Sequence, residues 1–134
     1  MSMKKYNCGC YYRSAYKEKD NLKDSSIIKK QKEEIFKYCQ KNNLKIIKEY
    51  IDEGYSGLNY ERPSYKEMIS DIKKGIINCV IVSDFSRITR NINDDFSGIL
   101  KDYNIRFIIT DINYDSILNS SNKSKYLKGI DICR

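Results

Sequence analysis

The chain has 134 residues, which is the size of one domain. Its 25 Lys and Arg against 18 Asp and Glu give a formal net charge of +7. This charge favours an anionic binding partner, with nucleic acid as the first candidate. The sequence contains no histidine, which excludes histidine bases, nucleophiles and metal ligands. No apolar run reaches the ~20 residues of a membrane helix and the N-terminus lacks the apolar core of a signal peptide, so we expect a cytoplasmic protein without membrane contact.

Strand patterns alternate with helical patterns along the chain. Short aromatic or β-branched runs predict strands, and apolar residues spaced by three and four predict helices. In order, we expect a strand over residues 5–12, a polar loop over 16–26, a helix from Ile28, a strand over 44–51, a loop over 52–62, a helix over 64–75, a strand over 79–82, a helix over 91–103, a strand over 105–110 and a weakly helical segment from about Ser124. This alternation implies an α/β fold with a mostly parallel central sheet of four to five strands and helices on both faces.

Three local features refine this prediction. Ser64 to Glu67 fits the capping box S-x-x-E directly after Pro63, so we expect Ser64 to cap the second helix. Gln31 lies on the apolar face of the first helix, where a structural role requires that its amide be hydrogen-bonded. The last ten residues look like a long helix cut short, so residues 1–134 are expected to be one domain from the N-terminal part of a longer protein.

Neither the cysteines nor the carboxylates predict a metal site. The five cysteines are irregularly spaced, and Cys8-x-Cys10 is too close for a zinc knuckle, so we expect buried structural thiols. A metal-dependent nuclease needs carboxylates clustered after strands. The candidates Asp84, Asp111 and Asp115 make a poor set, because we expect the last two in a turn. The cysteines and carboxylates therefore predict no metal site.

Arginines gather where strands of the predicted sheet end. In an open parallel sheet, ligands bind beyond the carboxyl ends of the strands. Four of the six arginines follow such ends: Arg13, Arg62, Arg87 and Arg90. Arginine is preferred over lysine where a phosphate takes two parallel hydrogen bonds. The alternative is four unrelated surface charges, but their shared position favours a phosphate site.

Four motifs in this order resemble one family. They are Tyr11-Tyr12-Arg13-Ser14-Ala15 on the first strand, Ser26 to Gln31 opening the first helix, Asp52 to Pro63 after the second strand, and Ser86-Arg87-Ile88-Thr89-Arg90-Asn91 after the third. Together they resemble the catalytic domain of serine recombinases, the resolvases and invertases, over about residues 5–115. The long segment from Asp52 and the Ser86 variant are most similar to the N-terminal domains of large serine recombinases of phages and mobile elements.

The resemblance implies DNA recombination by phosphoryl transfer on a resolvase-like fold. A serine attacks a phosphodiester of double-stranded DNA, a 5′-phosphoserine link forms, and a 3′-hydroxyl leaves. Homodimers would exchange strands within a synaptic tetramer, without metal or nucleotide cofactor. By the same resemblance Arg13, Arg87 and Arg90 stabilise the charge of the transition state, while Gln31, Arg62 and Ser86 match further positions around the phosphate. Ser86 stands where the smaller resolvases often carry aspartate. A tyrosine recombinase also needs no metal, but the histidine usual in its site is absent here.

The position of the nucleophile departs from the family pattern. It falls two residues after Arg13, where this sequence has Ala15, its only alanine. Ser14 would point to the opposite side of the strand and is a poor substitute. Because alanine cannot attack a phosphate, we expect this chain to be inactive. Either it is a naturally non-catalytic DNA-binding or regulatory homologue, or Ala15 is an engineered replacement of serine, which the placing of the single alanine favours.

Overall fold

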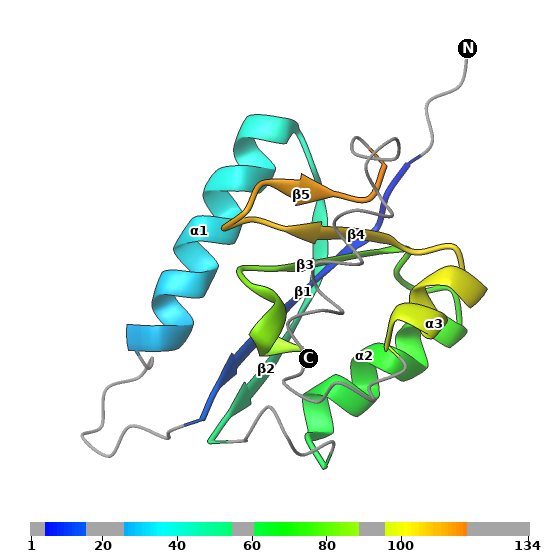
Figure 1. Ribbon diagram of the computed structural model, residues 1–134, viewed down its shortest axis with the longest axis horizontal. Coiled ribbons are helices and arrows are strands. Elements are labelled where there is room, and N and C mark those ends of the chain that lie inside the picture. Colours follow the sequence, from blue (N-terminus) through cyan, green and yellow to red (C-terminus); the bar gives the residue numbers. More distant parts are fainter. Residues whose placement is uncertain (1–4, 16–25, 55–60, 89–95, 118–134) are drawn as a thin grey trace.

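The structure is a computed structural model, which describes residues 5–15, 26–54, 61–88 and 96–117 (Figure 1). Its five-stranded sheet has the order β2-β1-β3-β4-β5. The strands are β1 (Cys8–Ser14), β2 (Ile46–Glu53), β3 (Cys79–Val82), β4 (Arg106–Ile109) and β5 (Tyr114–Asp115). The helices are α1 (Ser26–Asn42), α2 (Pro63–Lys73) and α3 (Phe96–Asp102), with a 3-10 turn, η1 (Phe85–Arg87), after β3. The first four strands pair in parallel, and β5 pairs with β4 antiparallel.

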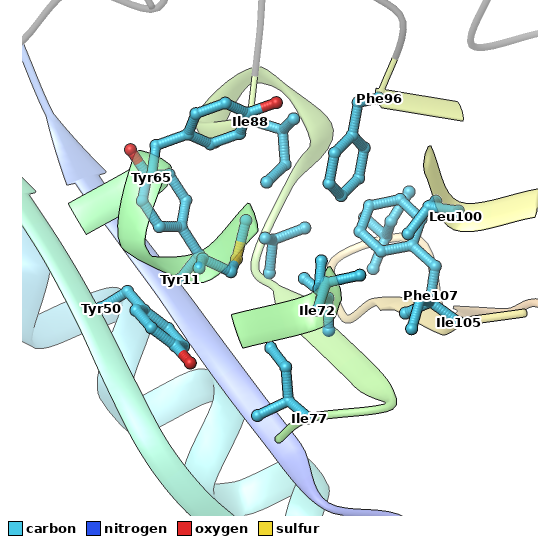
Figure 2. Packing of buried hydrophobic residues seen from close by; sticks show 14 of the residues in the cluster. Tyr11, Tyr50, Tyr65, Ile72, Ile77, Ile88, Phe96, Leu100, Ile105 and Phe107 are labelled. Carbon is cyan, nitrogen blue, oxygen red and sulfur yellow. The ribbon is translucent and has the colours of Figure 1, made fainter. Parts of the chain in front are cut away.

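Helices cover both faces of this sheet, as predicted. On one face α1 packs Ile28, Ile35 and Cys39 against side chains of β1, β3 and β4. On the other face, α2 and α3 enclose a larger aromatic and aliphatic cluster, part of which Figure 2 shows. The rings of Phe96 and Phe107 meet edge to face there, with their centroids 5.4 Å apart. The α/β fold with a mostly parallel sheet is therefore confirmed.

The first two strands both lie about two residues later than predicted. Asn43 takes a positive φ of 57°, and the N–H of Leu44 donates to the Cys39 carbonyl, so the residues after α1 belong to its cap. The second strand consequently begins at Ile46. The first strand continues to Ser14, which pairs with Glu53, so its polar end is part of the sheet.

The predicted capping box at the start of α2 is wrong. The Ser64 hydroxyl donates to the Ile51 carbonyl at 2.7 Å and caps nothing. The backbone N–H groups of Ser64 and Tyr65 instead donate to the Asp52 carboxylate, each at 2.9 Å. Because Asp52 lies at the end of β2, the cap ties the helix to the strand before it. A pattern within residues 64–67 could not reveal a partner twelve positions upstream.

A short antiparallel strand follows β4 where the sequence predicted only a polar segment. Asp111 lies in the expected turn, but Asp115 belongs to β5 and is buried. Arg106 donates from Nε and Nη2 to the two carboxylate oxygens of Asp115, at 3.0 and 2.5 Å. This bidentate pair stabilises a strand of only two residues. The predicted helical segments over 91–95 and from about Ser124 lie outside the described residues.

The four cysteines in the described part of the chain, Cys8, Cys10, Cys39 and Cys79, are buried free thiols, as expected, and Cys133 lies outside it. None of the helices described is long and apolar enough to cross a bilayer.

Asp71 joins α2 to β2 across the second face of the sheet. Its carboxylate, 4% exposed, accepts hydrogen bonds from the Tyr50 hydroxyl at 2.7 Å and from Lys48 Nζ at 2.8 Å. Burial acts to raise the pKa of Asp71, but the bonds from Lys48 and Tyr50 outweigh it and hold that pKa below its usual value. The ionised carboxylate therefore contributes to stability.

We expect Asp71→Asn to lower the free energy of unfolding by about 1–3 kcal/mol at neutral pH, because a charged acceptor is lost from one buried and one partly buried bond. A carboxyl with a lowered pKa stabilises above its unfolded pKa, and this stability is lost as the pH falls through the folded pKa. Urea unfolding should therefore show a difference from the parent chain that shrinks at acidic pH. Glu67→Gln is the control, since Glu67 also pairs with Lys48 but is 54% exposed and should cost less than about 1 kcal/mol. Equal losses would contradict this reading.

Candidate active site

The carboxyl ends of β1 and β3 lie side by side, because these strands are neighbours in the sheet (Figure 1). β1 ends at Ser14, and Ala15 follows it as an exposed residue. β3 ends at Val82, and η1 carries Arg87 a few residues beyond. The segment before the expected nucleophile and the segment with the expected phosphate arginine thus meet at one edge of the sheet.

Arg13 holds the η1 turn through two backbone carbonyls. Its Nη2 donates to the Ser86 carbonyl at 2.8 Å, and its Nε donates to the Arg87 carbonyl at 3.1 Å. The Arg13 residue is only 1% exposed. These bonds direct its guanidinium beneath the turn and fix the position of Arg87 relative to β1.

Arg62 supports the same turn from α2. Its Nη1 donates to the Arg87 carbonyl at 3.1 Å and to the Tyr11 hydroxyl at 3.0 Å, and its Nη2 donates to the Ile88 carbonyl. The guanidinium carbon lies 4.4 Å from the centroid of the Tyr65 ring, a cation–π contact. Arg62 is fully buried, so it shapes the site from inside the protein.

Tyr11 connects this arginine to a buried carboxylate. Its hydroxyl accepts from Arg62 and donates to Asp52 at 2.8 Å. Burial raises the pKa of Tyr11 above that of a free tyrosine, and the opposing charge of Arg62 does not offset the effect. Tyr11 therefore remains a neutral hydroxyl that relays hydrogen bonds.

Gln31 satisfies the backbone at the end of β1. Its Oε1 accepts from the Arg13 N–H at 3.1 Å, and its Nε2 donates to the Arg13 carbonyl at 2.9 Å. Nε2 also donates to the Ile27 carbonyl of α1 at 3.2 Å. The side-chain amide of Gln31 thus supplies hydrogen bonds that a neighbouring strand would otherwise give to the Arg13 backbone. This explains why a polar residue occurs on the apolar face of α1.

The η1 turn presents Arg87 at the surface. Arg87 Nε donates to the Asp84 carboxylate at 3.1 Å, and Nη1 donates to the Arg13 carbonyl at 3.2 Å. The Ser86 hydroxyl donates to the same carboxylate. With its side chain 24% exposed, Arg87 can reach an external anion, whereas Arg13 and Arg62 are buried. Arg90 lies outside the described residues.

The carboxylates considered for a metal do not form a set. Asp115 pairs with Arg106 at the far edge of the sheet, and Asp84 pairs with Arg87. Within residues 5–15, 26–54, 61–88 and 96–117, no three His, Cys, Asp or Glu side chains lie where they could hold a metal ion.

Three residues of this network, Tyr11, Asp52 and Asp84, are not among the predicted site residues, and the sequence indicates Asp84 only as a poor metal-ligand candidate. Asp52 near the end of β2 and Asp84 directly after β3 both accept from backbone N–H groups at the start of the following helical segment, but only Asp84 stands at the N-cap position that aspartate favours. Tyr11 lies two residues before Arg13, so strand alternation places both on one face. Their positions relative to strands and helices can be recognised in the sequence, but most of their hydrogen-bond partners are distant in sequence.

Three comparisons relate the chain to known proteins. The profile described as "Resolvase, N terminal domain" matches residues 8–128. An "uncharacterized immunity region protein 3" of Bacillus phage phi105 is 37% identical over 71 residues, which are 53% of this chain and 84% of that protein. The N-terminal catalytic domain of TP901-1 integrase has a similar fold, with a TM-score of 0.78, 23% identity, and coverage of 91% of this chain and 89% of that one. A resolvase family site-specific recombinase from Streptococcus pneumoniae gives a TM-score of 0.72 and 27% identity over 96% of this chain and 87% of its own.

We expect Gln31→Met to lower the free energy of unfolding by about 1–3 kcal/mol, because the Arg13 backbone then loses its two buried hydrogen bonds with the Gln31 amide. Methionine keeps the length and helix propensity of glutamine, so the loss reports the hydrogen bonds. Gln40→Met on the exposed side of the same helix is the matched control and should change stability by less than about 0.5 kcal/mol. Urea unfolding of both variants checks this, and an equal effect would refute the assigned role of Gln31.

Proposed function

The chain belongs to the resolvase N-terminal domain family, and from this membership we propose that it is the catalytic domain of a serine-type recombinase acting on double-stranded DNA. In the proposed reaction a serine at position 15 attacks a DNA phosphodiester through its hydroxyl oxygen. The bond from that oxygen to phosphorus forms, and the bond from phosphorus to the 3′-oxygen breaks. The 3′-oxygen leaves as a hydroxyl, and the 5′-phosphate stays on the serine until the reverse reaction rejoins the strands.

One observation carries this proposal: position 15 and the partly exposed side chain of Arg87 share one edge of the sheet. Arg87 contacts the carbonyl of Arg13, which lies two residues before position 15. A phosphoryl transition state concentrates negative charge, and a preorganised guanidinium stabilises such charge without a metal ion. Ala15 is exposed, so a serine there would be open to DNA.

The proposal divides the remaining site residues by their surroundings. Arg87 and, by resemblance, Arg90 contact the reacting phosphate. Arg13, Arg62 and Gln31 position the site, because their described bonds go mainly to backbone groups at the end of β1 and in or directly after η1. The carbonyl of Ser86 is one of those bonded by Arg13, so its place depends on that support.

Further parts of the proposal follow the family resemblance. The domain would act as a homodimer, and as a tetramer in the synaptic complex, within a longer protein that carries a separate DNA-binding region. No metal or nucleotide cofactor takes part. The proposed parent is a recombinase of a phage or another mobile element.

A second function is favoured by Ala15 itself. A homologue that lacks the nucleophile could bind DNA or regulate an active relative without cleaving it. The codon for residue 15 in the source gene discriminates between the two functions. A serine codon supports an engineered Ser→Ala change in an active recombinase, and an alanine codon supports the non-catalytic homologue.

We expect Ala15→Ser, in the full-length protein encoded by its gene, to restore covalent attachment to cleaved cognate DNA. The readout is a protein–DNA adduct that survives denaturation, measured with EDTA and with added magnesium. Because guanidiniums supply the positive charge, the adduct should form equally in both conditions. The parent chain with Ala15 is the control and should form none. Absence of any adduct, or strict dependence on magnesium, would contradict the proposed mechanism.

We also expect the 134-residue chain to bind DNA weakly and with little sequence preference. Its exposed lysines are spread over the described residues, and the described helices all pack on the sheet. In that part of the chain the exposed lysines are Lys5, Lys29, Lys30, Lys37, Lys41, Lys45, Lys66, Lys73, Lys74 and Lys101. Phosphate contacts give affinities of about 10⁻⁴–10⁻⁶ M that fall steeply with salt. Titration of cognate and scrambled duplexes at two salt concentrations tests this. A preference above about a hundredfold for the cognate duplex would show a recognition element in this domain, since dedicated binders reach roughly 10³–10⁷.

A further inference from the structure

Asp84 lies between β3 and η1 and holds two neighbouring groups at once. Its carboxylate accepts from the Ser86 N–H at 3.0 Å and from the Ser86 hydroxyl, which caps η1. The same carboxylate accepts from Arg87 Nε at 3.1 Å. One side chain therefore sets both the start of the turn and the direction of the arginine that the turn presents.

The Arg87 guanidinium is anchored at two of its three nitrogens. Nε donates to Asp84, and Nη1 donates to the Arg13 carbonyl at 3.2 Å. Two fixed points define the plane of a rigid guanidinium. Across the part of the chain that the structure describes, Nη2 has no protein acceptor, and the side chain is 24% exposed. Nη2 is thus the nitrogen left for an external anion.

The fold has little need of this ion pair. Arg13 and Arg62 already hold the carbonyls of the turn from its buried side. The side chains of Asp84 and Arg87 are 28% and 24% exposed, and ion pairs open to solvent contribute little to stability. We therefore attribute the Asp84–Arg87 ion pair to the function of Arg87 and not to the stability of the fold.

A carboxylate at this place also opposes DNA binding. Two further carboxylates, those of Glu34 and Asp111, lie at the same edge, and burial together with the charges of Asp84 and Glu34 raises the pKa of Asp111. Negative charge beside a phosphate-binding arginine weakens its attraction for a phosphate. A site with Asp84 therefore binds DNA less tightly than the same site without it. Asp84 must then provide a compensating gain in the rate of the reaction.

We propose that Asp84 is a positioning residue for phosphoryl transfer: it fixes Arg87 in the direction that the transition state requires, at the expense of DNA affinity. This inference rests on the proposed function of the chain. In this proposal Asp84 touches no substrate and transfers no proton, and it affects the reaction through its bond to Arg87 Nε. Its removal should therefore have two effects of opposite sign, which the loss of a merely structural contact would not produce.

The test compares Asp84→Asn with Asp111→Asn in the full-length protein carrying Ala15→Ser. Both substitutions remove one negative charge from this edge, but only Asp84 contacts Arg87, and asparagine keeps an oxygen to cap η1. For Asp84→Asn we expect single-turnover adduct formation at saturating DNA to slow about 10- to 100-fold, because the Arg87 guanidinium is then no longer held in the direction that the transition state requires. DNA should bind about two- to fivefold more tightly at low salt. For Asp111→Asn we expect the tighter binding with an unchanged rate.

A second measurement does not depend on cleavage. In the 134-residue chain labelled with ¹⁵N, the Nε–H resonance of Arg87 should shift or disappear in Asp84→Asn and stay in place in Asp111→Asn, while thermal unfolding confirms that both fold. An unchanged Arg87 resonance in Asp84→Asn would overturn the positioning role even if no adduct ever forms. Equal slowing by the two variants, or a proportional loss of rate and binding in Asp84→Asn, would overturn it as well. Failure of Ala15→Ser to form any adduct refutes the proposed function instead.

Discussion

Three consecutive backbone carbonyls, those of Ser86, Arg87 and Ile88, determine how this end of the molecule is organised. A turn as short as η1 leaves its carbonyls without helical partners, and a buried carbonyl without a donor is costly. Two buried guanidiniums satisfy them from below. The charge of Arg62 is itself compensated by aromatic rings and by a hydroxyl that leads to Asp52. Since Asp52 also caps α2, one connected network of hydrogen bonds joins β1, β2, α2 and η1.

The part of this fold that can be predicted from sequence is the part that depends on short apolar runs. Cys79–Val82 is continuously apolar and forms the buried β3 as expected, and the alternation of strands and helices gives the correct class. Strand ends and caps depend instead on contacts between distant segments, so the end of β1, the cap of α2 and the existence of β5 could not be read locally. The same limit applies to the site. Motif spacing predicts that arginines meet at one edge. Contacts with the η1 carbonyls and with the Tyr65 ring decide that Arg13 and Arg62 are buried, and spacing carries no information about those contacts.

Stability and chemistry are separable at this site. Each buried charge in it has its partners within the protein, and none of the bonds described involves the side chain at position 15. Ala15 is exposed at the end of β1, outside both packed clusters. Position 15 can therefore change between alanine and serine without disturbing the architecture that surrounds it, so the fold is compatible with alanine at the position proposed for the nucleophile.

The strand order has a consequence for synthesis of the chain on the ribosome. β1 lies between β2 and β3, so the first strand made must wait for two partners, and the second of these begins 71 residues later along the chain. Arg13 reaches the carbonyl of Arg87 across 74 positions. Contacts between such distant residues form late, because a long loop must close first. A nascent chain that has emerged only through β2 can have a strand pair and α1, but it lacks Arg62 and Arg87, so the hydrogen-bond network between β1 and η1 forms only after β3 and η1 have emerged.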